Sequence, residues 1–170
     1  SEMCIRDSVH RWTYVLSSET TSKYEEVRVK FKKFINAYNS DEIIFTKGCT
    51  EGFNLLANSL CKNLNKGDEI ILSEIEHHAN IIPWQMAAKK YGLNIKYIKI
   101  DDSYNLDLDH LNSLLTSKTK IVSIVGESNM SGMLPNIKEI VSNVKSKSDA
   151  IFILDGAQLV PHRFVDVQDL

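Results

Sequence analysis

The sequence is poor in the residues that mark disulfide-bonded and metal-binding proteins. It has three cysteines, at positions 4, 49 and 61, and their spacing fits neither a zinc site nor a disulfide framework. So few cysteines favour a reducing compartment, and we expect a cytoplasmic protein. No apolar run approaches the roughly 20 residues that a membrane span needs, and no secretory signal peptide is visible.

Charge of one sign is also scarce. The 20 basic and 22 acidic side chains leave a formal net charge of -2, which argues against a general binder of nucleic acids or anionic membranes. The seven glycines form neither a GxGxxG fingerprint nor a Walker loop with its lysine. The hydrophobic content of 43% is nevertheless enough for the core of one domain, or of part of a larger one.

The first eight residues differ in character from the rest. Met3 to Ser8 can be back-translated as ATGTGTATAAGAGACAG, which matches a transposase end sequence used in sequencing libraries. We therefore expect residues 1–8 to be an adapter-derived lead without fold information, and residues 9–170 to be the native chain. Re-sequencing the source locus would test this hypothesis.

Along residues 9–170, short apolar runs alternate with segments whose apolar residues repeat at the helical period. Strands are predicted over residues 43–45, 69–73, 95–100, 120–125 and 151–154, the last as a strand buried on both faces. Helices are predicted to follow from residues 22, 50, 80, 107 and 135. This alternation favours an α/β fold, a mostly parallel sheet of about five strands with helices on both faces.

Local signals mark the boundaries of three of these helices. Ser22 and Glu25 have the spacing of a capping box at a helix start. Gly92 is expected to end the helix that runs from about Asn80. Pro135 is expected to begin the helix whose apolar face carries residues 137, 140, 141 and 144.

Polar groups of different chemistry follow four of the predicted strands. They are Gly48-Cys49-Thr50, Glu76-His77-His78, Ser128-Asn129 and Asp155 to Gln158. In open α/β sheets, ligands bind outside the carboxyl ends of the strands. We therefore expect these segments to converge at one edge of the sheet and to form one ligand site.

Each segment also has an ordinary structural explanation. Thr50 suits a helix N-cap, and Asp155 suits a turn after a strand. The two histidines are either inert loop residues or metal ligands, although adjacent side chains diverge and no third ligand is evident, so we predict no metal site. A single histidine ring stacked on a flat cofactor is the functional alternative.

Taken together, the four segments call for a ligand with four properties. A helix start at Thr50 suits a phosphate, and His77 suits a flat ring. Asp155 suits a basic ring nitrogen, and Asn129 with Gln158 suits a ring oxygen. Pyridoxal 5'-phosphate (PLP) meets all four demands, because a carboxylate keeps its ring nitrogen protonated and makes the ring an electron sink.

At these residues the chain resembles the class V aminotransferase-like family, and within it the Suf-type cysteine desulfurases. The resemblance covers roughly Val9 to Leu170. It is carried by IFTKGCTE (residues 44–51), GDEIILSE (67–74), EHHANIIPWQ (76–85), LDGAQ (154–158), VPH (160–162) and VDVQDL (165–170). It implies the amino-terminal part of a PLP-binding large domain of the aspartate aminotransferase-like fold type I.

The resemblance also implies residue roles. Thr50 and the backbone at Cys49 would hold the phosphate, and His77, the predicted catalytic residue, would stack on the ring. Asp155 would pair with the ring nitrogen, while Asn129 and Gln158 would bond the ring oxygen. The segment His10-Arg11 would border the active site.

The chain departs from the family pattern at three positions. Cys49 stands where the family usually has threonine, which removes one phosphate-binding hydroxyl but leaves the amide. Gly126 and Tyr14 each stand where a histidine is common. These departures bear on substrate handling more than on cofactor binding.

For the complete protein, the resemblance implies a cysteine desulfurase that converts L-cysteine to alanine and passes persulfide sulfur to an acceptor protein for iron–sulfur cluster assembly. A homodimer is implied as well. The Schiff-base lysine and the persulfide-forming cysteine of the family lie beyond residue 170, so we expect this chain alone to be inactive. Selenocysteine lyase, another class V enzyme and a non-catalytic α/β ligand-binding module are the alternatives.

Overall fold

The structure is a computed structural model that describes residues 15–101 and 103–170. The predicted lead, His10-Arg11 and Tyr14 therefore lie outside the described residues. The described chain forms two compact units. The first contains residues 15–45 and 164–169, and the second contains residues 46–163 together with Leu170.

The first unit is built on helix α2 (Val15–Phe34), which is followed by the 3-10 turn η1 (Ser40–Glu42). The predicted capping box is wrong, because the helix already begins seven residues before Ser22. Glu25 instead pairs with Arg28 one turn further on, with 3.0 Å between Oε2 and Nε. Ser22 is thus an interior helical residue.

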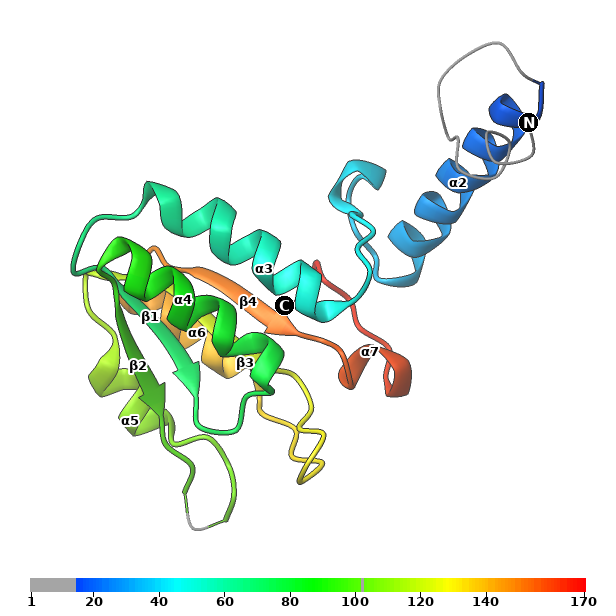
Figure 1. The fold of residues 1–170 in the computed structure, drawn as a ribbon. Helices are drawn as coiled ribbons and strands as arrows, with labels where there is room; N and C mark the ends of the chain where they lie inside the picture. The colour runs from blue at the N-terminus through cyan, green and yellow to red at the C-terminus, as the bar shows by residue number, and fades with distance from the viewer. Residues whose placement is uncertain (1–14, 102) are drawn as a thin grey trace. The chain divides into compact units, whose positions relative to one another are not determined.

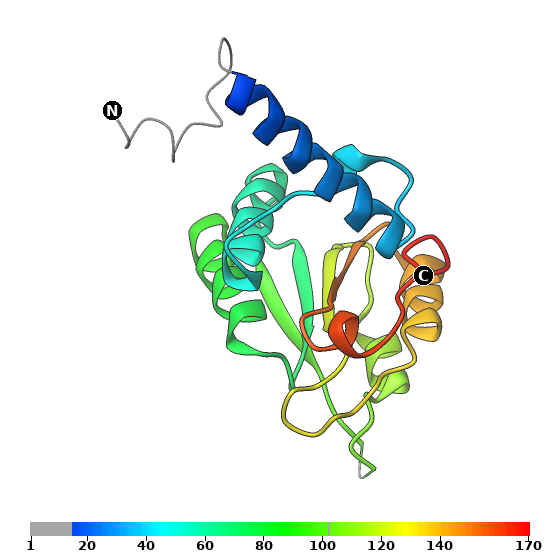
Figure 2. The same cartoon turned by 90° about the vertical axis from the view of Figure 1, so that its right-hand side faces the viewer.

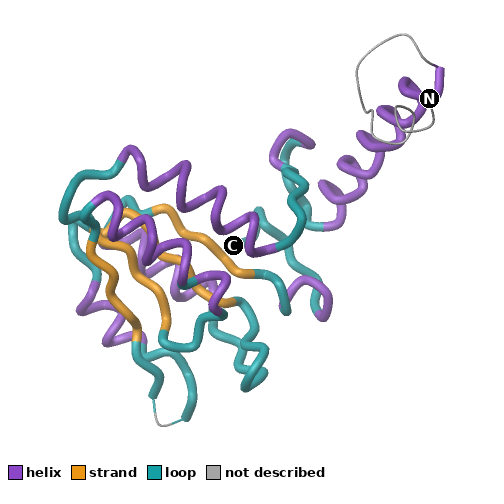
Figure 3. Tube along the Cα trace, viewed as in Figure 1, coloured by secondary structure: helices purple, strands orange, loops and turns teal. Residues whose placement is uncertain are grey.

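The predicted strand at residues 43–45 is also wrong, and this segment is a loop (Figure 3). A strand needs a neighbouring strand to bond its backbone. Here the Ile43 carbonyl accepts a hydrogen bond from the Arg28 guanidinium. The Phe45 ring packs edge-on against Tyr24 and Phe31 of α2, with centroid distances of 5.4 and 5.6 Å. Side chains of the helix therefore replace a sheet partner.

The second unit contains a four-stranded parallel sheet (Figure 1). Its strands are β1 (Glu69–Ser73), β2 (Asn94–Ile98), β3 (Thr119–Val125) and β4 (Ile151–Asp155), in the spatial order β2-β1-β3-β4. The α-helices are α3 (Cys49–Leu60), α4 (Ile82–Tyr91), α5 (Leu108–Leu114), α6 (Ile137–Lys147) and α7 (Leu159–His162); η2 (Cys61–Asn63) and η3 (His78–Asn80) are short 3-10 turns. The predicted α/β class and the parallel sheet are confirmed.

Helices cover both faces of this sheet, as the sequence predicts (Figure 2). On one face, Phe53 of α3 and Trp84 of α4 pack with Ile70 and Leu72 of β1. On the other, α5 and α6 pack on alternate strand residues such as Ile71. All four predicted core residues of α6 are buried, namely Ile137, Ile140, Val141 and Val144.

The helix ends follow local chemistry, with two small shifts from the predicted boundaries. Gly92 ends α4 in the left-handed conformation, at φ 72°, as expected. The segment after His77 first forms η3, so α4 itself begins at Ile82. Pro135 lies before α6, whose N-cap is Asn136, because the Asn136 side chain accepts a hydrogen bond from the Glu139 amide.

Strand β4 differs from its prediction as a strand buried on both faces. Ile151 is 49% exposed, Phe152 to Leu154 are half-buried, and only Asp155 is buried. The reason is its place at the edge of the sheet, where β3 is its only neighbour among the described strands. None of the helices in the described part of the chain is both long and apolar enough to cross a membrane.

The order of the strands fixes where a ligand can bind. The chain runs from β1 outward to β2 on one side, and then returns past β1 to β3 and β4 on the other. The direction of winding therefore reverses between β1 and β3. A crevice opens at such a switch point, outside the carboxyl ends of the strands.

The buried face of α6 gives a direct test of the core. Ile140 is 1% exposed, so we expect Ile140→Ala to lower the free energy of unfolding by about 2–5 kcal/mol through lost burial and a cavity. Met86→Ala, at a side chain that is 65% exposed on α4, should change it by less than about 0.5 kcal/mol. Equilibrium urea unfolding measures both, and equal losses would contradict the packing described.

Candidate functional site

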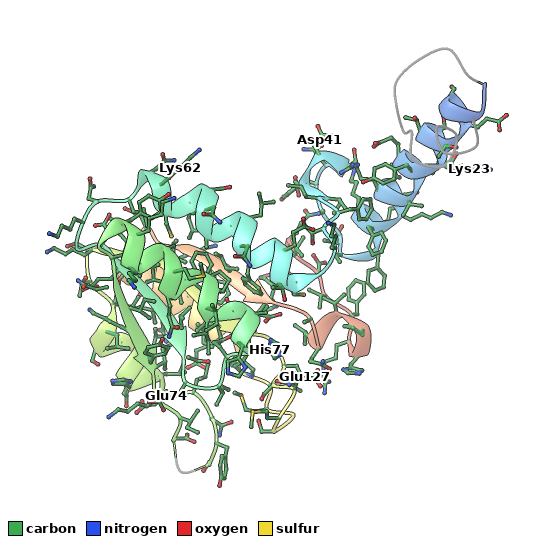
Figure 4. The ribbon with its side chains drawn as sticks, in the orientation of Figure 1. Lys23, Asp41, Lys62, Glu74, His77 and Glu127 are labelled. Carbon is green, nitrogen blue, oxygen red and sulfur yellow. The ribbon has the colours of Figure 1, made fainter. Side chains whose placement is uncertain are left out.

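A pocket of about 220 Å³ lies in the second unit, among the segments that follow the strands. It is lined by Cys49, Thr50, His77, Ala79, Val125, Glu127, Asn129, Asp155, Ala157 and Gln158. The six residues predicted from the sequence as a cofactor site are therefore brought together in one place. Figure 4 labels His77 and Glu127, which come from the loops after β1 and β3.

One wall of the pocket is the first turn of α3. Its N-cap is Gly48 at φ 156°, a conformation that suits glycine, and this residue has no side chain with which to cap the helix. Thr50 is therefore the second residue of the helix and not its N-cap. The Cys49 and Thr50 side chains are exposed. This helix start offers free N–H groups and a positive dipole end to an anion.

His77 enters the pocket from the loop after β1, at the N-cap of η3. Its Nδ1 accepts a hydrogen bond from the Ala79 amide at 3.1 Å. In the neutral ring the proton must then sit on Nε2, so the imidazole has a fixed tautomer. Among the described residues that line the pocket, His77 is present and its neighbour His78 is not.

Asp155 closes the carboxyl end of β4 and is 5% exposed. Its Oδ1 accepts a hydrogen bond from the Ala157 amide at 3.0 Å, which turns the chain after the strand. The bond confirms the turn role that the sequence suggested. The turn also brings Gln158 to the same pocket. A structural role of Asp155 in the turn is therefore compatible with a role in ligand binding.

The loop after β3 supplies Asn129 and also Glu127, for which no role is predicted from the sequence. Asn129 is exposed, whereas the Glu127 side chain is 16% exposed. Glu127 Oε1 lies 3.7 Å from His162 Nδ1, and its Oε2 lies 3.6 Å from Arg163 Nε. These contacts are too long for hydrogen bonds, and the one to Arg163 is an ion pair. They link the loop after β3 to the end of α7.

Behind the pocket lies a buried polar network that sequence reasoning missed. Glu76 is 8% exposed and accepts hydrogen bonds from the Val125 amide at 2.9 Å and from Asn80 Nδ2 at 2.7 Å; it also contacts the Ser73 hydroxyl. The signal was an acidic residue three positions after the end of a fully buried strand. It was hidden because the more distinctive histidine pair follows it at once.

Burial shifts the acid–base behaviour of two groups at the site. Burial, and to a lesser degree the charge of Asp155, raises the pKa of Glu76 to about 7, against the hydrogen bonds it accepts. Partial desolvation of its sulfur atom and the same charge raise the pKa of the Cys49 thiol, although the side chain as a whole is exposed. A thiol with a raised pKa is a poor nucleophile at neutral pH.

The space around Gly126 is crowded. A Cβ atom at this position would lie 2.8 Å from Leu159 Cδ2 and 3.1 Å from the Asp155 carbonyl oxygen. The Gly126 amide also donates to that same carbonyl, at 2.8 Å. The strand end and the Leu159 side chain thus fill the space that a side chain at 126 would need.

The pocket therefore combines an anion-binding helix start, a histidine of defined tautomer and a buried carboxylate. Within residues 15–101 and 103–170, no group of three or more His, Cys, Asp or Glu side chains is arranged to hold a metal ion. This donor set suits a small, phosphorylated aromatic ligand with a basic ring nitrogen.

Comparison with known proteins gives relatives along nearly the whole chain. The cysteine desulfurase of Serratia proteamaculans is 45% identical over 164 residues, which are 96% of this chain and 40% of that protein. The probable cysteine desulfurase of Halalkalibacterium halodurans is 40% identical over the same shares. The chain thus spans about 40% of the length of the curated relatives it matches.

A solved structure shows the same arrangement of elements. The cysteine desulfurase from Thermococcus onnurineus NA1 superposes with a TM-score of 0.89 at 37% identity, over 99% of this chain and 42% of that one. A family model described as aminotransferase class-V matches residues 4–170. Since that model extends over nearly the entire sequence, the chain belongs to the aminotransferase class-V family.

Proposed function

We propose that the pocket binds PLP. The uncapped amides at the start of α3 suit its phosphate, and the buried Asp155 carboxylate suits its ring nitrogen. When bound, PLP supplies an electron sink for bonds broken at an amino acid's α-carbon. One structural neighbour of this chain, at 19% identity, carries a glycine covalently linked to PLP.

Different pocket residues would then bind different parts of the cofactor. The backbone at Cys49 and the Thr50 hydroxyl hold the phosphate, while His77 lies against the ring. Asp155 keeps the ring nitrogen protonated, and its burial strengthens that ion pair by excluding water. Asn129 and Gln158 donate hydrogen bonds to the ring oxygen.

We further propose that the complete protein containing this chain is a cysteine desulfurase. The observation that carries this is the 40–45% identity to curated cysteine desulfurases together with the six predicted residues gathered in one pocket. In the reaction, the C–S bond of L-cysteine breaks and an enzyme thiolate gains the sulfur as a persulfide. Alanine is left once its β-carbon takes up a proton.

Neither cysteine in the described part of the chain suits the role of that thiolate. Cys61 is fully buried, and burial raises the pKa of its thiol to about 11. Cys49 sits in the proposed phosphate loop with a raised pKa. The persulfide cysteine and the lysine that holds the cofactor would lie in the longer protein. A homodimer, a cytoplasmic location and delivery of sulfur to an acceptor protein for iron–sulfur cluster assembly complete this proposal.

The complete reading frame around this chain decides the function. We expect its purified product, loaded with PLP, to form equal amounts of alanine and persulfide sulfur from L-cysteine, measured by amino-acid analysis and by sulfide release under a thiol reductant. A preference for selenocysteine would move the assignment to a lyase of that substrate. Absence of both products would contradict the proposal.

Replacement of Asp155 tests its ion pair with the ring nitrogen. We expect Asp155→Ala to retain some PLP but to lose at least about a hundredfold in turnover, because breaking one side of a shielded charge pair costs about 3–5 kcal/mol. Asp149→Ala, at an exposed residue just before β4, is the control and should remain active. Near-normal alanine formation by Asp155→Ala would refute the role.

The two histidines provide a matched pair of variants. His77→Ala should alter both the absorbance spectrum of bound PLP and the rate of alanine formation, because its ring lines the pocket. His78→Ala should leave both close to wild type, since His78 is exposed and outside that lining. Cofactor spectra and steady-state kinetics of the two variants are compared, and a loss confined to His78→Ala would reverse the assignment.

A further inference from the structure

The buried network around Glu76 lies next to the proposed cofactor site, yet the roles above do not use it. Glu76 directly precedes His77, and its carboxylate reaches the end of β3 by accepting the Val125 amide hydrogen bond. Asn80 is fully buried and completes the η3 turn that begins after His77. The chain is therefore fixed by buried hydrogen bonds on both sides of His77.

The orientation of Asn80 is itself determined. Its Oδ1 accepts from Trp84 Nε1 at 2.9 Å and from Ser123 Oγ at 2.6 Å, so its Nδ2 must point to Glu76. That nitrogen donates to Glu76 Oε2. Because Oε1 and Oε2 each receive an N–H donor, the surroundings suit a carboxylate. Ser73 can donate to the charged form or accept from the protonated one.

The network also lies one strand away from Asp155. Val125, which bonds Glu76, is the register partner of Asp155 in the β3–β4 ladder. Two carboxyl groups thus flank one residue of β3, and both are less than 10% exposed. The negative charge of Asp155 therefore opposes ionisation of Glu76.

No described basic side chain pairs with Glu76 in compensation. Its contacts from β1, β3 and η3 are the uncharged Ser73, Val125 and Asn80. His77 follows it in the chain, with Nδ1 already engaged by the Ala79 amide. Glu127 lines the same pocket, but its nearest basic groups are His162 and Arg163. Asp155 is therefore the charge that acts on Glu76.

Resting on the PLP site described above, we propose that Glu76 is a positioning residue with two roles. It holds the turn that carries His77. It also releases a proton from its own carboxyl group when the cofactor's ring nitrogen binds at Asp155. In the free protein, burial and, to a lesser degree, the charge of Asp155 oppose ionisation of Glu76, which stays partly protonated. A protonated ring nitrogen at Asp155 cancels the second of these effects. A larger fraction of Glu76 then gives its proton to solvent, and the carboxylate adds to the negative potential at the ring.

The sign of the pH dependence follows directly. The pKa of Glu76 is about 7 without the cofactor and falls when the positive ring nitrogen binds. Binding therefore releases a proton near neutral pH, so the affinity for PLP rises as pH increases through this range. If the pKa of Glu76 fell by one unit on binding, the affinity for PLP would rise about tenfold over the whole pH range. About fivefold of this rise would occur between pH 6 and pH 8.

The test measures PLP binding to the cofactor-free full-length protein between pH 6 and pH 8 by fluorescence titration. We expect Glu76→Gln to lose this pH-dependent component. The ratio of wild-type affinity to variant affinity should therefore be about fivefold larger at pH 8 than at pH 6. Glu74→Gln is the matched control, because Glu74 lies two residues away on the same loop and is exposed (Figure 4). It should follow the wild-type profile.

A second variant keeps the proposal testable if Glu76→Gln does not fold. The Ser73 hydroxyl lowers the pKa of Glu76, so Ser73→Ala should raise that pKa and move the midpoint of the linked proton release to higher pH. A purely structural network would leave the midpoint unchanged.

The outcomes separate this inference from the cofactor proposal. If wild type, Glu76→Gln and Ser73→Ala bind PLP with the same pH profile, the coupling is refuted while the cofactor site stands. The coupling is also refuted if Glu74→Gln removes the pH dependence as fully as Glu76→Gln. Failure of wild type to bind PLP at any pH overturns both proposals.

Discussion

The hydrogen bond from the Val125 amide to the buried Glu76 carboxylate joins the ends of two strands across the switch point of the sheet. The pocket depends on this link because it ties the loop after β1, which carries His77, to the end of β3, which also lines the pocket. The loop after β1 is fixed by Glu76 and Asn80, and Ser123 and Val125 anchor that network in β3. Register then places Asp155 beside Val125. A rigid parallel ladder thus determines the spacing of side chains that are far apart in the sequence.

Much of this arrangement was predictable. It follows from the periodicity of the apolar residues and from the rule that ligands bind at the carboxyl ends of parallel strands. Four of the five predicted strands formed, and the six predicted pocket residues came together. The fifth, at residues 43–45, has the composition of a strand but no partner. The carbonyl of its first residue, Ile43, accepts a hydrogen bond from the Arg28 side chain. Composition reports what a strand needs on its faces and says nothing about whether a neighbouring strand is available.

The parts that could not be predicted are those that depend on three-dimensional neighbours. Glu76 looks like an ordinary loop acid until Val125 and Asn80 are placed around it. The contacts of Glu127 need the loop after β3 and the end of α7 to meet. The helix that begins at Val15 also shows that a local capping signal at Ser22 yields to the continuing backbone ladder. Local patterns name candidate groups, and the tertiary fold decides which of them interact.

The close packing around Gly126 limits how this pocket can change over evolutionary time. A mutation that gives residue 126 a side chain strikes the Leu159 methyl group and the backbone behind it, so it is unfavourable. The Leu159 methyl group ends a flexible side chain and can move aside, whereas the Asp155 carbonyl oxygen, 3.1 Å from the added Cβ, belongs to the backbone. A side chain at residue 126 therefore requires the ends of β3 and β4 to separate by a few tenths of an ångström. The strand ladder, more than the size of residue 159, keeps a glycine at this position.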